Sequence, residues 1–509
     1  MFSFFSPESS ETRGLLSSPA SQAPDPPGDG VRVAGGPTKT SMALAAVNFA
    51  NGVVGAGIVG LPSAFNQMGL PLGVCSCVAV ATCSQYTIRL LAEMGTAHGL
   101  SNYLDLSQRG FGDIGYYVCS MFQAIFAFGA MVTYLIIFAD TLPSVLSNDS
   151  DAAANLATRR LALTISGFLV LLPLSLIRSF GNLARLGLLK LGATLFLTFT
   201  VCYYAVNLPT TSNYSPACKY TAVHRDYFPA LGTIAFAFVC HHQTFLVQGS
   251  LVNATPRRFA MTTALAIFGS FSLSLAVACA GYLTFFENTG CSATQCTGDL
   301  FVSYEYYDLR FSIPVPQLLN TARLLLAANM IITYPGELMV VRGTVESILN
   351  RRRKALRWRE LDSPLHDVAT LAQLRAQEVE QASRAADLWS PGMPLTQPLL
   401  EHVLITFLLF LLSYTIAMLV SDISIILNLT GSTAAVFLSF LFPAALRLRL
   451  GKDANDQDPL LHPSNAAPIF VLIFGAVAFV ASSGYTIVQV IAPQILSRAP
   501  ETRQGIQCT

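Results

Sequence analysis

The sequence predicts an all-α polytopic membrane protein with eleven transmembrane helices. Hydrophobic residues make up 52% of the 509 residues, charged residues make up only 12%, and the apolar residues gather in long stretches. A soluble domain normally carries about 25% charged residues. The composition therefore excludes the soluble class. The net charge of +1 gives no basic field for a nucleic acid, so we expect no nucleic-acid partner.

Each apolar stretch is long enough to cross a lipid bilayer. A span needs about 20 mostly apolar residues, because a helix that rises about 1.5 Å per residue must cross roughly 30 Å of hydrocarbon. Charges, Pro and Gly clusters or polar loops bound every stretch. The eleven predicted spans are 42–66, 71–92, 116–141, 161–177, 186–207, 228–250, 260–286, 316–341, 402–420, 423–446 and 467–493.

The segments outside the spans complete the predicted organisation. Residues 1–41 are rich in Ser, Pro and Gly and have no basic start leading into a short apolar run, so we expect a disordered tail and no signal peptide. Spans 1 to 8 fill 42–341. The loop at 342–401 is expected to hold a short helix, with Ser363 as its N-cap and its end near Asp387. Spans 9 to 11 fill 402–493, and 494–509 form a second tail.

Positive residues orient the predicted spans. The amino-terminal tail and the loops after spans 2, 4, 6, 8 and 10 hold 20 of the 30 Lys and Arg residues, the opposite side holds 7, and Arg89, Lys190 and Arg323 lie within spans. Since Lys and Arg are retained on the cytosolic side, the amino terminus is expected in the cytosol and the carboxyl terminus in the lumen or outside the cell. Glycosylation sequons at Asn148 and Asn213 fall in loops on that non-cytosolic side, as usable sequons must.

Span 1 contains four glycines within nine residues, from Gly52 to Gly60. Its spacing matches a dinucleotide fingerprint, but that motif needs a preceding strand and a soluble helix, so we reject it. Glycine costs about 1 kcal/mol relative to Ala in a helix interior, and Asn51 adds a polar group at membrane depth. Close helix packing through small residues is the alternative. We expect an unwound segment whose free amides and carbonyls bind a ligand.

Span 6 has a matching interruption. Residues 240–244, Cys-His-His-Gln-Thr, break an apolar run midway. In transporters with inverted repeats, a broken span 1 has a broken span 6 as its partner. Spans 1–5 and 6–10 are therefore expected to form two inverted halves, with span 11 as an addition.

His241 and His242 lie in this interruption and leave two interpretations open. Adjacent histidines point to different faces of a helix and cannot form the i, i+4 pair of a helical zinc site, so we expect no transition metal. One interpretation is structural, with a ring bonded to a neighbouring helix. The other is substrate binding or proton coupling, because His titrates near neutral pH.

Four motifs together resemble the amino acid/auxin permease family. They are Asn51 to Pro62, Phe236 to His242, Gly281 to Phe285 and Thr333 to Pro335. Within the family the sequence is most similar to the sodium-coupled neutral amino acid transporters. The resemblance covers about residues 40–350 well and spans 9 to 11 loosely. It implies a leucine-transporter-like fold, with a 5+5 inverted repeat plus one helix.

The resemblance also implies a sodium site between spans 1 and 8. It places the backbone carbonyls of Ala50 and Val53 and the side chains of Asn51 and Thr333 at the ion. Na⁺ takes neutral oxygen ligands, in agreement with this set. No cofactor is expected, and Na⁺ or H⁺ is the expected coupling ion.

The implied substrate is a neutral amino acid. Wider similarity to the fold places the amides of Gly55 and Ala56 at its carboxylate, as suits a half-helix amino terminus. Asn329 shares a helix face with Thr333 and is expected either at the site or in a bond between helices. The predicted substrate-binding residues are Gly55, Ala56, Gly57, His241, His242 and Asn329.

Three cysteines fall in loops on the oxidising side of the membrane, and the family often ties these two loops together. The resemblance therefore implies a disulfide between Cys218 and either Cys291 or Cys296. A local bridge between Cys291 and Cys296 is the alternative.

The tail carries an acidic dileucine pattern at Glu11, Leu15 and Leu16, and a second one lies at 456–461. These patterns suit recognition by sorting adaptors, and they favour an endolysosomal or vacuolar membrane, with the plasma membrane as the alternative.

These features predict a secondary active transporter of neutral amino acids that works by alternating access. Spans 1, 2, 6 and 7 would rock against spans 3, 4, 5, 8, 9 and 10. A membrane amino acid sensor with little transport is the alternative. An intramembrane hydrolase lacks a recognisable nucleophile motif, so we expect no enzyme.

Overall fold

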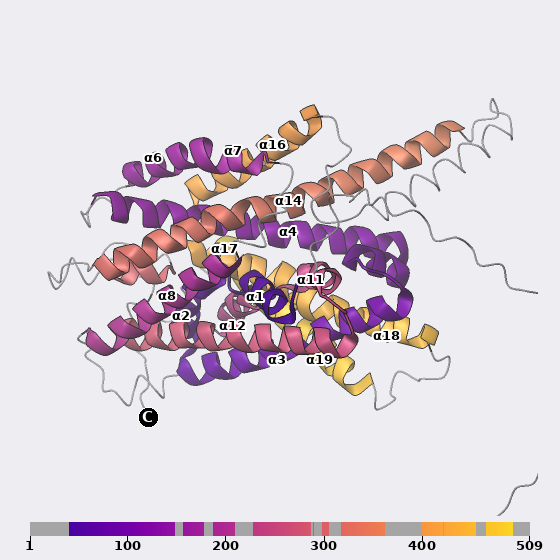
Figure 1. Ribbon diagram of the computed structural model, residues 1–509, viewed down its shortest axis with the longest axis horizontal. Helices are drawn as coiled ribbons and strands as arrows, with labels where there is room; N and C mark the ends of the chain where they lie inside the picture. The colour runs from indigo at the N-terminus through magenta and orange to yellow at the C-terminus, as the bar shows by residue number, and fades with distance from the viewer. Residues whose placement is uncertain are drawn as a thin grey trace, which may run out of the picture. The chain divides into compact units, whose positions relative to one another are not determined.

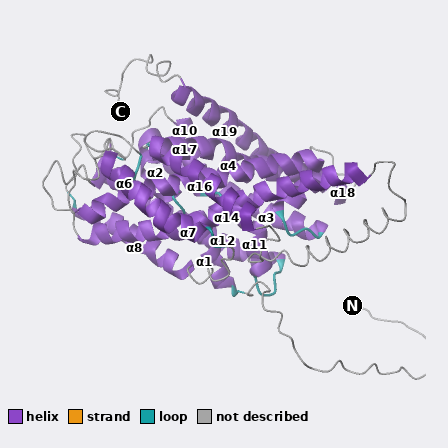
Figure 2. Ribbon diagram, turned by 90° about the horizontal axis from the view of Figure 1, so that it is seen from above, coloured by secondary structure: helices purple, strands orange, loops and turns teal. Residues whose placement is uncertain are grey.

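A computed structural model describes residues 40–147, 156–177, 187–208, 227–286, 289, 298–304, 317–361, 399–420, 422–454 and 465–491. All of them belong to one compact unit, residues 37–509. Within the described residues, ten helices are long and apolar enough to cross a membrane, and one bent helix pair makes an eleventh span. Figure 2 shows the helices joined by loops. The predicted all-α fold with eleven spans is confirmed.

The first five spans follow the predicted order. Span 1 is a bent pair, span 4 is continued by a π-helical turn, and the other three are single helices. Their elements are α1 (Met42–Val53) with α2 (Gly57–Met68), α3 (Leu70–His98), α4 (Tyr103–Ser147), α6 (Leu156–Ser166) with η1 (Gly167–Leu171) and α7 (Leu172–Ser175), and α8 (Gly187–Asn207).

Spans 6 to 11 again include an interrupted helix at the start. Their elements are α10 (Tyr227–Ala237), η3 (His241–Gln243) and α11 (Thr244–Ser250), α12 (Pro256–Phe285), α14 (Gln317–Leu361), α16 (Leu399–Leu419), α17 (Ile423–Thr430) with η5 (Gly431–Ala435), η6 (Phe437–Leu441) and α18 (Phe442–Ala454), and α19 (Ala466–Ile491).

Two groups of helices pack closely within themselves. α12 contacts α1, α2 and α3, and α10 packs on α2. The long helices α4 and α14 lie side by side, as Figure 1 shows, and α16 and α17 pack on α4.

Apolar side chains remain exposed on outer helices, among them Leu161, Phe199, Leu408 and Phe470. An apolar exterior of this kind suits contact with lipid.

Helices α4 and α14 extend beyond the predicted spans. α4 begins at Tyr103 and bends at Phe111 and Gly112, and α14 continues to Leu361. Arg351 joins the two extensions, because its guanidinium lies 3.9 Å from the centre of the Tyr116 ring and 3.1 Å from a carboxylate oxygen of Asp113.

Several predicted features lie outside the described residues. They are the helix from Ser363 to Asp387, the glycosylation candidates Asn148 and Asn213, the disulfide candidates Cys218, Cys291 and Cys296, and the sorting pattern at Glu11, Leu15 and Leu16.

Candidate functional site

The break in span 1 is an unwound turn between α1 and α2. The two helices are bent by 53° relative to each other. Val54 has φ −83° and ψ 80°, the conformation of an inverse γ-turn, and the Gly55 amide donates to the Val53 carbonyl at 3.0 Å. No side chain caps the start of α2 at Ala56, so its first turn carries backbone amides without a capping partner. The predicted unwinding is confirmed.

Close packing explains the next glycine, Gly57. A Cβ atom at this position would lie 2.7 Å from the Ala237 Cα at the end of α10. The broken spans 1 and 6 therefore touch at Gly57 through backbone atoms. Of the two interpretations of the glycines, unwinding holds at 54–56 and close packing holds at Gly57.

The break in span 6 is tied to α3 through His241. This side chain is fully buried, and its Nε2 lies 2.8 Å from the Thr87 hydroxyl oxygen. The same hydroxyl lies 2.9 Å from the Cys83 carbonyl oxygen. When it donates to that carbonyl, His241 donates from Nε2 to Thr87. This bond to a neighbouring helix is the one that the structural interpretation of His241 expects, and the buried Nδ1 atom of the ring has no hydrogen-bond partner within the described part of the chain.

His242 and Gln243 lie toward span 1 and α4. The His242 ring centre is 5.5 Å from that of Phe126, and its Nε2 is 3.2 Å from the Gln243 amide nitrogen. The Gln243 amide lies directly against Gly52, where a Cβ would collide with it. The two breaks therefore meet through Gln243 and Gly52.

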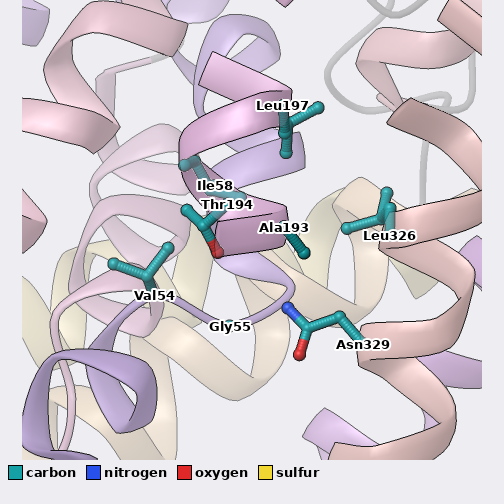
Figure 3. A pocket seen from close by; sticks show the side chains of 8 residues that line it. All are labelled: Val54, Gly55, Ile58, Ala193, Thr194, Leu197, Leu326 and Asn329. Carbon is teal, nitrogen blue, oxygen red and sulfur yellow. The ribbon is translucent and has the colours of Figure 1, made fainter. Parts of the chain in front are cut away.

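A small cavity adjoins the break in span 1, between α2, α8 and α14. In Figure 3 the Asn329 amide and the Thr194 hydroxyl extend toward the backbone at Gly55. Its free space holds about one water molecule, which is less than an amino acid needs. It is lined by Val54, Gly55, Ile58, Ala193, Thr194, Leu197, Leu326 and Asn329. Of the predicted substrate residues, Gly55 and Asn329 line this cavity, and Ala56, Gly57, His241 and His242 do not.

The predicted ion ligands are bonded to protein groups. Asn51 donates from Nδ2 to the Gly187 carbonyl at 2.7 Å. Thr333 donates to the Asn329 carbonyl at 2.7 Å. The Ala50 carbonyl accepts from the Val54 amide at 2.7 Å.

No hydrogen bond between described residues joins Asn51 to Thr333. Carbonyl and hydroxyl oxygens keep lone pairs after one hydrogen bond, so they remain able to bind a cation.

Sequence reasoning missed the contribution of α8. This helix provides the carbonyl of Gly187 to Asn51, and Ala193 and Thr194 to the cavity. The available signal was Lys190, a charged residue inside a predicted apolar span, followed one turn later by Thr194.

Residues 38–488 match the sequence model of the family described as transmembrane amino acid transporter protein. Sodium-coupled neutral amino acid transporter 11 of Danio rerio is 28% identical over 446 residues, which are 86% of each chain. Vacuolar amino acid transporter 2 of Saccharomyces cerevisiae is 25% identical over 460 residues, 89% of this chain and 84% of the yeast protein.

A solved structure has the same fold. It is a mutant of the manganese transporter of Eremococcus coleocola, with a TM-score of 0.53 and 11% identity over 91% of this chain and 89% of that chain. At this identity the likeness shows the fold alone, and it confirms the predicted leucine-transporter-like class.

Proposed function

Because the chain belongs to the transmembrane amino acid transporter protein family, we propose that it carries neutral amino acids across a membrane by alternating access, coupled to Na⁺ or H⁺. The observation that carries this proposal is the unwound turn of span 1. Its uncapped helix start adjoins a cavity and lies against the broken span 6. Unwound backbone at membrane depth is tolerated where it lines a cavity, and there it binds ligands.

The α-carboxylate of the substrate would bind the amides at the start of α2. A helix amino terminus carries a partial positive charge, and the amides of Ala56 and Gly57 belong to this turn. The Gly55 amide would exchange its bond to Val53 for a bond to the carboxylate. The remaining cavity walls suit a neutral side chain, because they are formed by uncharged residues such as Ile58, Leu197 and Leu326.

The coupling ion would bind next to this turn. Ala50, Asn51, Val53 and Thr333 supply the neutral oxygen atoms that Na⁺ prefers. Their present bonds to protein groups would lengthen or be shared when the cation enters. For H⁺, His242 is the candidate that the sequence predicts, and its ring lies beside the span 6 break without the buried bond that holds His241.

Transport would move one helix group against the other. The group of α1, α2, α3, α10 and α12 packs together, and α4 and α14 form the core of the second group. The cavity between them is too small for an amino acid in this conformation. Exchange with either side therefore requires the two groups to separate.

The membrane would be endolysosomal or vacuolar, with the plasma membrane as the alternative. The pattern at Glu11, Leu15 and Leu16 supports sorting by adaptors, and the yeast relative is named for the vacuole. Microscopy of a tagged chain checks this. Replacement of Leu15 and Leu16 by Ala should move the protein to the cell surface, and an unchanged distribution would remove the sorting role.

Radiolabelled amino acid flux in proteoliposomes tests the function. Neutral amino acids should accumulate when a Na⁺ or pH gradient is imposed. Asn329→Leu should lower kcat/KM about tenfold or more, because it removes a hydrogen-bonding amide from the cavity. Thr321→Val, on the exposed face of the same helix, is the matched control and should keep the flux.

One outcome would contradict the carrier, and a second would contradict only its proposed binding site. Flux that is absent while an amino acid still raises the thermal stability of the protein would favour a sensor. Flux that is equal in Asn329→Leu and Thr321→Val would show that the cavity is not the binding site.

A further inference from the structure

A lysine occupies the buried face of α8. Lys190 follows Gly187 by one turn and precedes Thr194 and Leu197 at helical spacing, and these neighbours face the bundle. The opposite face is exposed and apolar, as at Leu188 and Phe199. Lys190 therefore lies between the bond from Gly187 to Asn51 and the cavity.

A glutamate faces it from α14. Glu337 lies on the same face as Asn329 and Thr333, at a spacing of four residues. It is only 7% exposed, and its Oε2 atom has no hydrogen-bond partner. Helices α8 and α14 pack together, and Lys190 and Glu337 act on each other electrostatically.

The two charges differ from a structural ion pair. Arg159 and Asp140, a structural pair between α6 and α4, are in direct contact. No ion pair within 4.0 Å joins Lys190 to Glu337 among the described residues. Charges inside a membrane span are costly and mark functional sites. Lys190 and Glu337 bear the cost of burying charge inside a span without a direct ion-pair contact that would offset it.

Few other titratable groups face the pair. α1 carries no charged residue, and α12 carries only Cys279 and Tyr282 as titratable residues between Arg258 and its end. From α4, the neutral phenol of Tyr134 lies near Glu337. The net charge of this region therefore depends on whether Glu337 holds a proton.

We propose that Glu337 takes up the coupling proton and that the Lys190 ammonium is the fixed positive charge that faces it from α8. A proton from the more acidic side adds to a carboxylate oxygen of Glu337 and leaves on the other side after the helix groups have moved. While Glu337 is neutral, the Lys190 charge is uncompensated and attracts the substrate carboxylate at the start of α2. Proton and amino acid therefore bind together.

This inference rests on the proposed function and names its coupling ion. In proteoliposomes a pH gradient should drive accumulation of a radiolabelled neutral amino acid, and a Na⁺ gradient at equal pH should not. Glu337→Gln, which imitates the protonated form, should keep exchange of internal for external substrate and lose accumulation under the pH gradient. Its substrate affinity should no longer change with pH.

Three further variants sharpen the test. Lys190→Met should weaken substrate binding about tenfold or more, because the attracting charge is gone, and Lys190→Arg should restore most of it. Glu93→Gln removes an exposed carboxylate from α3 and should keep the wild-type response to pH.

Several results would overturn the inference. They are accumulation driven by Na⁺ alone, accumulation under a pH gradient in Glu337→Gln with exchange intact, or loss of the pH response only in His241→Gln or His242→Gln. Exchange without any response to pH would remove this inference and leave the carrier in place. Absence of exchange in the wild type would remove both.

A measurement on the wild-type protein covers the case in which the variants do not fold. The heat of amino acid binding should differ between buffers of different ionisation enthalpy, in proportion to about one proton taken up per substrate. Equal heats in all buffers would contradict proton uptake.

Discussion

Gly57 is the residue at which the two broken spans come into contact. Gly57→Ala should lower the melting temperature in detergent, because the new Cβ would lie 2.7 Å from the backbone of Ala237 and overpacking costs about 1–3 kcal/mol. Gly192→Ala in α8 is the matched control. That position has nothing within 4 Å, so Ala should keep or slightly raise the melting temperature. Equal melting temperatures in the two variants would contradict the close contact.

His241 and Thr87 form a bond that should be measurable as coupling between two variants. Thr87→Val and His241→Ala should each destabilise the protein by about 1–3 kcal/mol, because the first leaves the buried His241 Nε2–H unpaired and the second leaves a buried cavity. The double variant should be less destabilised than the sum of the two. Strict additivity in a thermal unfolding cycle would show that the pair is not coupled. His242→Gln should spare stability and change the uptake of substrate, since that ring is only partly buried.

Single residues were predictable from the sequence where their type conflicts with a continuous transmembrane helix. The glycines around Gly55 and the polar run at 240–244 oppose a continuous helix, so both breaks could be located. Partners far along the chain could not be found in this way. The hydrogen bond from Asn51 to Gly187 joins residues 136 positions apart. No pattern within the sequence indicates that these two residues are in contact. Lys190 was visible as a charge, but the burial of its helix face appears only when α8 packs on α14.

At the scale of elements, two glycine junctions differ only in backbone conformation. Gly99 ends α3 with φ 65° and ψ 26°, whereas Gly112 bends α4 with φ 64° and ψ −155°. A Cβ would meet nothing within 4 Å at either position. The same substitution at both positions therefore compares the energetic cost of the two backbone conformations, without a contribution from steric contacts.

Asn is the residue that distinguishes the two junctions. Gly99→Asn should be nearly neutral, because Asn tolerates the left-handed helical region. Gly112→Asn should destabilise the protein by about 1–3 kcal/mol, because its region is open almost only to Gly. Melting temperatures of the two variants check the prediction, and a larger loss at Gly99 would contradict it.

Span ends were the least predictable part of the elements. Hydropathy marks where a helix leaves the apolar layer, and the predicted ends of α4 and α14 follow it. Both helices continue because of contacts made beyond that layer. The ion pair between Arg351 and Asp113 is one of these contacts, and it depends on two helices lying side by side. A pattern within one helix does not contain such information.

At the scale of the whole molecule, the proposed cycle needs α1 to move against α8. In this structure the two are in contact: an added Cβ at Gly187 would lie 3.6 Å from the Asn48 Cγ. The Asn48 Cβ is bonded directly to that Cγ, so cysteines at these positions would have Cβ atoms within one bond length of this distance, a range that overlaps the Cβ separation of about 3.5–4.5 Å that a disulfide needs. The double variant Asn48→Cys with Gly187→Cys should therefore lose flux when oxidised and regain it after reduction.

A bridge inside the moving group is the matched control. The Thr40 and Ser250 hydroxyl oxygens are 3.4 Å apart, and the backbones of these two segments are hydrogen-bonded at 2.8 Å. Both segments adjoin broken spans of the same group, so Thr40→Cys with Ser250→Cys should form its bridge and still transport. The four single-cysteine variants are controls for disulfides between one introduced cysteine and a native cysteine. Undiminished flux through the bridge between α1 and α8 would mean that these helices stay together throughout the cycle. The same block by both bridges would mean that spans 1 and 6 do not move as one body.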